Sequence, residues 1–287
     1  MATPLALDLQ AFKAAQRTQW DQSAAGWNAH TPLIRAWLRQ TTDAMMEMAR
    51  IAPGMAVLDL AAGAGDQTLD IARRVGPAGC VLATDLSPAI LALAQQNARQ
   101  AGLNNVETRV ADGESLPLEA ATFDAAVCRL GLMFFPDPLA GLRELHRVLR
   151  PGAGVCTVVF SRPEKNPCLG MLMSTALAHA GLPARDPYQP GALMSLGRPG
   201  QLDALFHQAG FRDVASTAVA APFCLPSVAH YLDFVRSSAS PIQQILGRLD
   251  AAAAQAAWDE MAVKLARFAT ADGWVGPNEL LLTAARR

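Results

Sequence analysis

The stretch Val57-Leu-Asp-Leu-Ala-Ala-Gly-Ala-Gly-Asp-Gln-Thr68 decides the fold of this chain. It begins inside a short apolar run, Ala56 to Leu60, which predicts a buried strand. Gly63 and Gly65 follow, separated by one residue. Two glycines at this spacing let the backbone turn tightly and approach a ligand closely. The stretch therefore predicts a strand that leads into a ligand-binding turn.

Six further segments have the apolar character of strands. They are Cys80 to Ala83, Val106 to Val110, Phe123 to Cys128, Val155 to Phe160, Phe211 to Val219 and Glu279 to Ala284. Ser87-Pro88 and Asp137-Pro138 each supply an N-cap and a fixed first turn for an intervening helix. We expect the second of these helices to end near Arg150, with Pro151-Gly152 as its stop. This alternation predicts an α/β fold, a Rossmann-like, seven-stranded, mostly parallel sheet with helices on both faces.

The chain of 287 residues predicts a single domain with four parts. Residues 1–50 have helical spacing and form a predicted N-terminal lid. Residues 51–222 form the core, and residues 223–274 form a helical insertion that covers the carboxyl edge of the sheet. Residues 275–287 contain the final strand.

Composition excludes several classes of protein. The net charge of −1 gives no global attraction for nucleic acid. Without an apolar run of about 18 residues, no membrane span is expected. The five cysteines form no C-x-x-C pair, which favours free thiols in the cytoplasm. No cluster has metal-ligand spacing, so we expect no metal, and the sequence leaves the oligomeric state open.

Acidic residues lie at the carboxyl ends of three successive predicted strands. Asp59 stands in the first, Asp85 follows the second, and Asp112-Gly113-Glu114 follows the third. In an open parallel sheet, ligands bind outside the carboxyl ends of the strands. A carboxylate at Asp85 can accept hydrogen bonds from both hydroxyls of a ribose. The pattern therefore predicts a nucleoside-binding crevice.

One alternative is an NAD(P)-dependent oxidoreductase. Its dinucleotide fingerprint needs a third glycine, where this chain has Thr68. Asp59 and Asp66 flank the turn and would repel a diphosphate at the helix N-terminus. Neither Tyr188 nor Tyr231 is followed four residues later by lysine. A non-catalytic cofactor-binding module is a second alternative.

Val57 to Thr68 resembles motif I of class I methyltransferases that use S-adenosylmethionine (SAM), in the type 11-like branch that includes the ubiquinone/menaquinone C-methyltransferases. Asp85-Leu86-Ser87 resembles its ribose-binding segment, and Ala111 to Pro117 its adenine-side segment. Trp20-Asp21 and Ala24 to Trp27 resemble its N-terminal helix, which closes over the cofactor. Specific matches cover about residues 20 to 155. The resemblance implies a SAM-dependent methyltransferase acting on O, N or C of a small molecule.

The resemblance also implies roles for individual residues. The predicted cofactor-binding residues are Asp59, Ala61, Gly63, Gly65, Gln67, Asp85, Leu86, Ser87, Asp112, Gly113, Glu114, Cys128 and Arg129. Gly63 and Gly65 would line the methionine moiety, and Asp59 would orient the turn. Asp85 would hold the ribose hydroxyls, with Leu86 packed on adenine. Asp112 would accept from the adenine amino group near the Gly113 amide, and the backbone at Cys128 and Arg129 would face the amino end of the cofactor.

The sequence indicates the substrate-binding residues less specifically than the cofactor-binding residues. Trp20, Trp27, Met133 and Phe134 are predicted to form the lid and the substrate wall, with core packing as the alternative. His30 is the candidate general base, with a surface or helix-capping role as the alternative. The chain lacks the quinone enzymes' catalytic-region signature, so a quinone precursor is not expected. It also lacks the Asn/Asp-Pro-Pro-aromatic tetrapeptide, a motif typical of amino-methylating enzymes that act on DNA bases.

Overall fold

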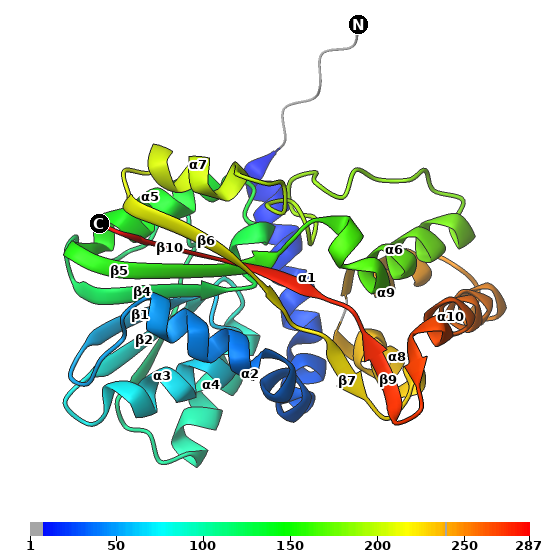
Figure 1. Cartoon of the computed structure of the whole chain (residues 1–287), viewed down its shortest axis with the longest axis horizontal. Helices are drawn as coiled ribbons and strands as arrows, with labels where there is room; N and C mark the ends of the chain where they lie inside the picture. The colour runs from blue at the N-terminus through cyan, green and yellow to red at the C-terminus, as the bar shows by residue number, and fades with distance from the viewer. Residues whose placement is uncertain (1–7, 239) are drawn as a thin grey trace, which may run out of the picture.

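The computed structural model describes residues 8–238 and 240–287 and has a seven-stranded sheet at its centre (Figure 1). The strands lie in the order β3-β2-β1-β4-β5-β10-β6, and only β10 runs antiparallel to its neighbours. Their bounds are β1 Ala56–Leu60, β2 Cys80–Asp85, β3 Val106–Val110, β4 Phe123–Arg129, β5 Leu149–Phe160, β6 Arg212–Ala220 and β10 Glu279–Arg286. All seven predicted strands are therefore present, and the predicted fold class is confirmed.

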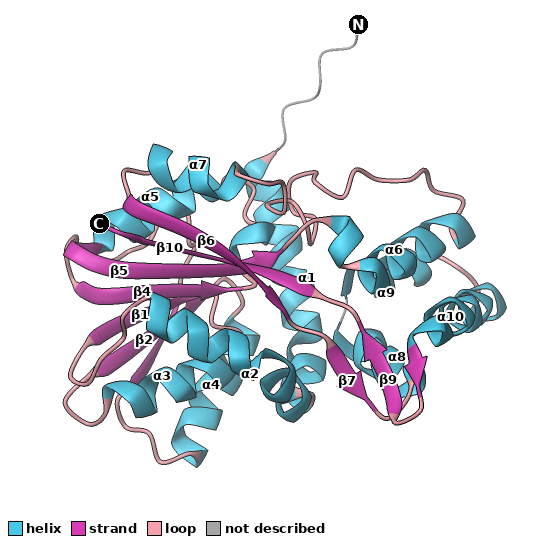
Figure 2. Ribbon diagram, in the orientation of Figure 1, coloured by secondary structure: helices cyan, strands magenta, loops and turns pink. Residues whose placement is uncertain are grey.

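Helices cover both faces of this sheet (Figure 2). Helices α2, α3 and α4 pack side by side on one face, and α5 and α7 pack together on the other. Their bounds are α2 Thr31–Met48, α3 Asp66–Val75, α4 Pro88–Gln100, α5 Pro138–Val148 and α7 Gln201–Gln208. The main core lies between these layers and includes fully buried Leu58, Val127 and Val158. Strands buried on both faces explain why the sequence shows continuous apolar runs rather than alternation.

The predicted helix starts are correct, but one predicted helix end is wrong. The side chains of Ser87 and Asp137 cap α4 and α5 by accepting backbone hydrogen bonds from Ile90 and Ala140. Helix α5 ends at Val148, and β5 begins at the next residue, so Pro151-Gly152 lies inside a strand. Between Phe123 and Ala125 the pairing of β4 with β5 shifts register. An irregularity of this kind accommodates a proline that has no N–H to donate.

We predicted that residues 223–274 form a helical insertion. The segment between β6 and β10 is instead only partly helical. It contains α8 Val228–Ser238, α9 Ser240–Leu246 and α10 Ala251–Leu265, together with a small sheet of β7 Phe223–Leu225, β8 Ala269–Thr270 and β9 Gly273–Gly276. Trp274 on β9 anchors this sheet, since its indole is buried and donates to the Leu265 carbonyl. Helix α6, Pro167–His179, packs against α9 and α10. We call α6 and residues 223–276 together the cap.

Helix α1, Leu9–Ala29, runs between the sheet and the cap (Figure 1). It packs against α4 of the core and against α8 and α9 of the cap. Residues 1–7 of the predicted lid lie outside the described residues. Within residues 8–238 and 240–287, no helix is long and apolar enough to cross a membrane.

Candidate active site

A cavity of about 210 Å³ opens at the carboxyl ends of the parallel strands. It lies beside β1, which pairs with β2 on one side and with β4 on the other, where the strand order reverses. Reversal points of this kind are where open α/β sheets bind ligands. Thirteen of the predicted site residues line the cavity: Trp20, Trp27, Ala61, Gly63, Gln67, Asp85, Leu86, Asp112, Gly113, Glu114, Arg129, Met133 and Phe134.

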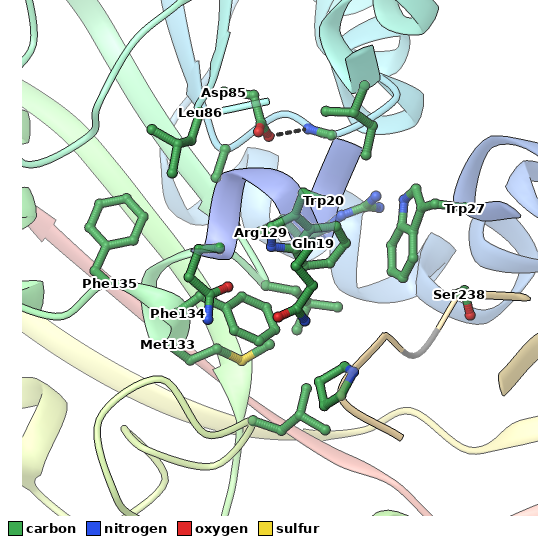
Figure 3. A pocket seen from close by; sticks show the side chains of 18 of the residues that line it. Gln19, Trp20, Trp27, Asp85, Leu86, Arg129, Met133, Phe134, Phe135 and Ser238 are labelled. Atoms are coloured by element: carbon green, nitrogen blue, oxygen red, sulfur yellow. Dashed lines mark hydrogen bonds between the residues drawn. The ribbon is translucent and has the colours of Figure 1, made fainter. Parts of the chain in front are cut away.

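The loop after β1 and the end of β2 meet at this cavity (Figure 3). Asp85 accepts hydrogen bonds from the backbone N–H of Gly63 at 3.0 Å and of Ser87 at 3.0 Å. Gly63 has a positive φ of 59°, and a Cβ there would meet no heavy atom closer than 3.7 Å. The space beside it is therefore open to a ligand. Burial raises the pKa of Asp85, and the two backbone donors oppose that rise.

Asp59 lies beneath the loop and does not line the cavity. Its carboxylate accepts hydrogen bonds from Thr68 Oγ1 at 2.5 Å and Gln67 Nε2 at 3.2 Å. Burial raises the pKa of Asp59 to about 7, despite these hydrogen bonds. Thr68 stands where the dinucleotide fingerprint has its third glycine. Its hydrogen bond to Asp59 fixes the turn between β1 and α3.

A buried ion pair crosses the floor of the cavity. Arg129 Nη2 lies 2.5 Å from the Asp66 carboxylate and 2.7 Å from Gln67 Oε1, and Arg129 Nη1 donates to Thr42 at 2.8 Å. The turn is therefore less negative than the sequence indicates, so it would repel a diphosphate less strongly. Arg129 neutralises Asp66, and with a pKa of about 7 Asp59 carries only part of a negative charge at neutral pH.

The adenine-side carboxylates have a cation partner that sequence reasoning missed. Lys13 of α1 lies 2.6 Å from the Asp112 carboxylate and 2.5 Å from the Glu114 carboxylate. Burial lowers the pKa of Lys13, but the hydrogen bonds to both carboxylates outweigh it and raise that pKa overall. No local pattern links residues 99 positions apart, so the sequence carried no signal for this contact.

Further contacts hold α1 against the core. Asp21 accepts from Ser87 Oγ at 2.5 Å and from the Ala89 N–H at 3.3 Å. Trp20 packs edge-to-face on both Trp27 and Phe134, with ring centroids 5.9 and 5.4 Å apart. The predicted lid helix thus lies over the cavity, with both tryptophans in its wall.

Four other predicted residues do not line the cavity. At Gly65 a Cβ would lie 3.0 Å from the Ala94 Cβ, so this glycine allows close packing of α4. Ser87 caps α4, and Cys128 is buried with a pKa raised to about 12 by burial, which keeps its thiol protonated. His30 hydrogen-bonds Ser237 Oγ at 2.6 Å and lies edge-on to Phe234. Its role as a base stays a prediction, and no contact in the cavity supports it.

Sequence reasoning also missed much of the cavity wall. The wall continues through apolar residues of β5, α6, β7, α8, α9 and the loop before α7: Phe160, Leu169, Leu172, Met173, Leu193, Phe223, Phe234, Val235, Pro241 and Ile242. Figure 3 shows Asp85 and Leu86 on one side of the cavity and Met133 and Ser238 on the other. Scattered apolar residues of this kind have the same sequence signature as core residues. Among the described residues, no group of three His, Cys, Asp or Glu could hold a metal ion.

A sequence profile of the ubiE/COQ5 methyltransferase family matches residues 32–176, about half of the chain. The chain belongs to the ubiE/COQ5 methyltransferase family. This finding confirms the resemblance inferred from the loop after β1.

The matched relatives include the ubiquinone/menaquinone biosynthesis C-methyltransferase UbiE of Idiomarina loihiensis. It is 38% identical over 130 residues, which cover 45% of this chain and 50% of that protein. The demethylmenaquinone methyltransferase of Lactococcus lactis is 36% identical over 110 residues, which cover 38% of this chain and 44% of that protein. The chain thus spans about half the length of the curated relatives it matches.

Solved structures share the fold over most of the chain. The YcgJ protein of Bacillus subtilis has a TM-score of 0.57 and 18% identity, covering 87% of this chain and 99% of that one. The [4+2]-cyclase SpnF has a TM-score of 0.55 and 22% identity, covering 93% and 96%. At these identities the likeness shows the fold alone. The same architecture accompanies a cyclase, so the reaction has to be argued from the site.

Proposed function

We propose that this chain transfers a methyl group from SAM to a small-molecule acceptor. Family membership supports the reaction class. The observation that carries the proposal is Asp85, a half-buried carboxylate at the end of β2 that borders the cavity beside the open space at Gly63. An ionised carboxylate offers about four lone-pair sites, and backbone donors occupy two of them. The remaining two suit the hydroxyls of a ribose.

The other residues of this half of the cavity fit the rest of the cofactor. Asp112 and the Gly113 backbone would meet the adenine edge, and Arg129 with Asp66 would face the charged amino-acid end. Gln16 of α1 also borders the cavity, and its buried Oε1 has no hydrogen-bond partner among the described residues.

SAM, when bound, would supply an activated methyl group. The protein's own contribution is then alignment of the acceptor and exclusion of water. Trp20, Trp27 and Phe134 provide an apolar wall for this purpose. Proximity of this kind can lower a barrier by about 7–11 kcal/mol. His30 remains a candidate base for an acceptor that must lose a proton, and the acceptor atom is O, N or C.

Binding and turnover measurements test the proposal. Isothermal titration with SAM and with NAD⁺ should give binding of SAM alone, and binding of NAD⁺ alone would overturn the proposal. Incubation of labelled SAM with a panel of small metabolites should then give labelled product. A protein that binds SAM but transfers no label to any acceptor would instead be a binding module.

Two further expectations belong to this proposal. A small molecule is favoured over nucleic acid because the chain has a net charge of −1. A cytoplasmic location is favoured by the five cysteines, all unpaired within the described residues. We also propose a division of the chain into four parts: a lid (1–50), a core (51–222), an insertion (223–274) and a final strand (275–287).

A further inference from the structure

The adenine-side segment is joined by two hydrogen bonds to the part of the chain that follows β4. Glu114 Oε1 accepts from the Asp137 N–H at 2.7 Å, and Glu144 of α5 accepts from the Leu116 N–H at 2.7 Å. Both bonds are made by residues that come after Gly113 in the chain. They therefore do not by themselves place Gly113, whose backbone would meet the adenine.

Phe135 packs directly against Gly113. A Cβ added to Gly113 would lie 2.6 Å from Phe135 Cε2, far below the roughly 3.5–4.0 Å at which carbon atoms pack. The same ring lies against Gly141 of α5, where an added Cβ would lie 2.7 Å from Phe135 Cδ2. The ring of Phe135 thus fills a slot between two glycines, which we call the glycine slot.

The two glycines of the slot provide space and not an unusual backbone conformation. Neither Gly113 nor Gly141 has a positive φ, so alanine could adopt the backbone conformation of both. Gly141 also lies inside α5, where glycine is less favourable than alanine. The helix therefore contains an unfavourable residue at the position that makes room for the Phe135 ring.

Phe135 itself belongs to the wall of the cavity. Figure 3 shows it on the same side of the cavity as Leu86, the residue expected to pack on adenine. Its backbone is fixed at the end of a short turn after β4, where its N–H donates to the Leu132 carbonyl at 3.1 Å. Phe135 therefore connects the central sheet to the segment that would recognise the adenine.

We propose that Phe135 is a positioning residue for the cofactor. By filling the glycine slot it fixes Asp112 and the Gly113 N–H, and it thereby sets the preference of the site for adenine over other bases. The inference rests on the proposed function, because it assumes that the adenine of SAM lies at these two groups.

Hypoxanthine is the base that tests this preference. Adenine presents an amino donor and a ring-nitrogen acceptor, which a carboxylate and an N–H would pair with. Hypoxanthine presents a carbonyl acceptor and an N–H donor at the same two places. A fixed Asp112 carboxylate and a fixed Gly113 N–H would therefore be left without partners by hypoxanthine, and a site built for hydrogen bonds rejects such a ligand.

Equilibrium titration with S-adenosylhomocysteine and with S-inosylhomocysteine measures the preference, since these ligands differ only in the base. The wild-type protein should bind S-adenosylhomocysteine at least about tenfold more tightly. Phe135→Leu empties part of the glycine slot and frees Gly113 to shift. It should lower the ratio of the two affinities by about 2–12-fold, the range of one net hydrogen bond, while the affinity for S-inosylhomocysteine changes little.

Gly141→Ala tests the same contact from the side of α5. Gly141 does not line the cavity, and its added methyl group would push on the Phe135 ring. Gly141→Ala should therefore lower the ratio without altering any group that faces the ligand. Combining Gly141→Ala with Phe135→Leu should cost less than the product of the two separate losses, because the shorter side chain leaves room for the methyl group.

Two matched controls separate positioning from general loss of packing. Phe211 is buried against Phe206 and His146 and does not line the cavity, so Phe211→Leu should lower the melting temperature but keep the wild-type ratio. Gly170 of α6 has no atom within 4 Å of an added Cβ. Gly170→Ala should therefore leave the ratio unchanged.

Two results would overturn the inference. One is equal binding of the two ligands by the wild-type protein, and the other is a wild-type ratio in both Phe135→Leu and Gly141→Ala. Should Phe135→Leu fail to fold, the ratio in Gly141→Ala decides alone. Failure of the proposed function looks different, because the wild-type protein would then bind neither SAM nor S-adenosylhomocysteine.

Discussion

Arg129 and Asp66 form an ion pair with side chains only 4% and 5% exposed, and it joins the end of β4 to the start of α3. Removing one partner of such a pair leaves an uncompensated buried charge, which costs about 3–5 kcal/mol. Arg129→Gln should therefore lower the free energy of unfolding by that amount in urea denaturation. The double variant Arg129→Gln/Asp66→Asn should recover most of the loss.

An exposed ion pair provides the comparison for this experiment. Arg198 lies 3.5 Å from Asp186, and both side chains are more than half exposed. Arg198→Gln should change the free energy of unfolding by no more than about 1 kcal/mol. A double variant at positions 66 and 129 as unstable as Arg129→Gln alone would show that the charge imbalance is not the cause.

Asp85→Asn tests the ribose assignment. An amide removes the charge and two of the lone-pair sites while keeping the size of the side chain, so SAM binding should weaken by about 1–3 kcal/mol. Calorimetric titration measures this directly. Asp43→Asn, on the exposed face of α2, serves as the control and should bind SAM normally. Unchanged affinity in Asp85→Asn would remove the main support for the cofactor site.

Asp59 should make stability depend on pH. Burial raises its pKa in the folded protein to about 7, from about 3.8 when exposed. Between these values the folded state keeps a proton that the unfolded state has lost, so stability falls as pH rises from about 4 to about 7. Relative to Asp59→Asn, the wild-type protein should lose up to about 4 kcal/mol over this range.

Urea denaturation of both proteins at pH 4, 5.5, 7 and 8 measures that difference. Other carboxylates, including Asp85, contribute equally to both proteins and cancel. A difference between the two proteins that stays constant with pH would mean that Asp59 is ionised throughout the range.

Lys13 should control the opening of α1. Lys13→Met keeps the apolar stem but removes the charge that binds Asp112 and Glu114. A partly exposed ion pair contributes about 1 kcal/mol at most, so SAM should dissociate up to about fivefold faster. Stopped-flow fluorescence of Trp20 and Trp27 reports this rate. The effect should shrink at high salt.

Arg17→Met is the matched control on the same helix, because Arg17 is exposed and makes no ion pair with the residues described. Its dissociation rate should equal that of the wild-type protein. Dissociation that is equally fast with and without Lys13 would mean that the aromatic contacts of Trp20 alone hold the helix down.

The sequence by itself determined the sheet, the glycine loop and the acidic strand ends. These features are local, since an apolar run, a pair of glycines and a carboxylate after a strand each lie within a few residues. Asp85, Asp112 and Gly63 therefore reach the cavity as the pattern indicated. We predicted the end of α5 near Arg150 because a proline such as Pro151 ordinarily stops a helix. Helix α5 instead ends at Val148, and a register shift between β4 and β5 accommodates Pro151 inside a strand.

Only the tertiary structure decided which distant groups meet. Lys13 pairs with Asp112 across 99 residues, and Arg129 pairs with Asp66 across 63. The apolar wall of the cavity likewise gathers residues from separate elements. Such contacts depend on packing between segments with no fixed spacing in the chain, so no periodicity in the sequence could encode them.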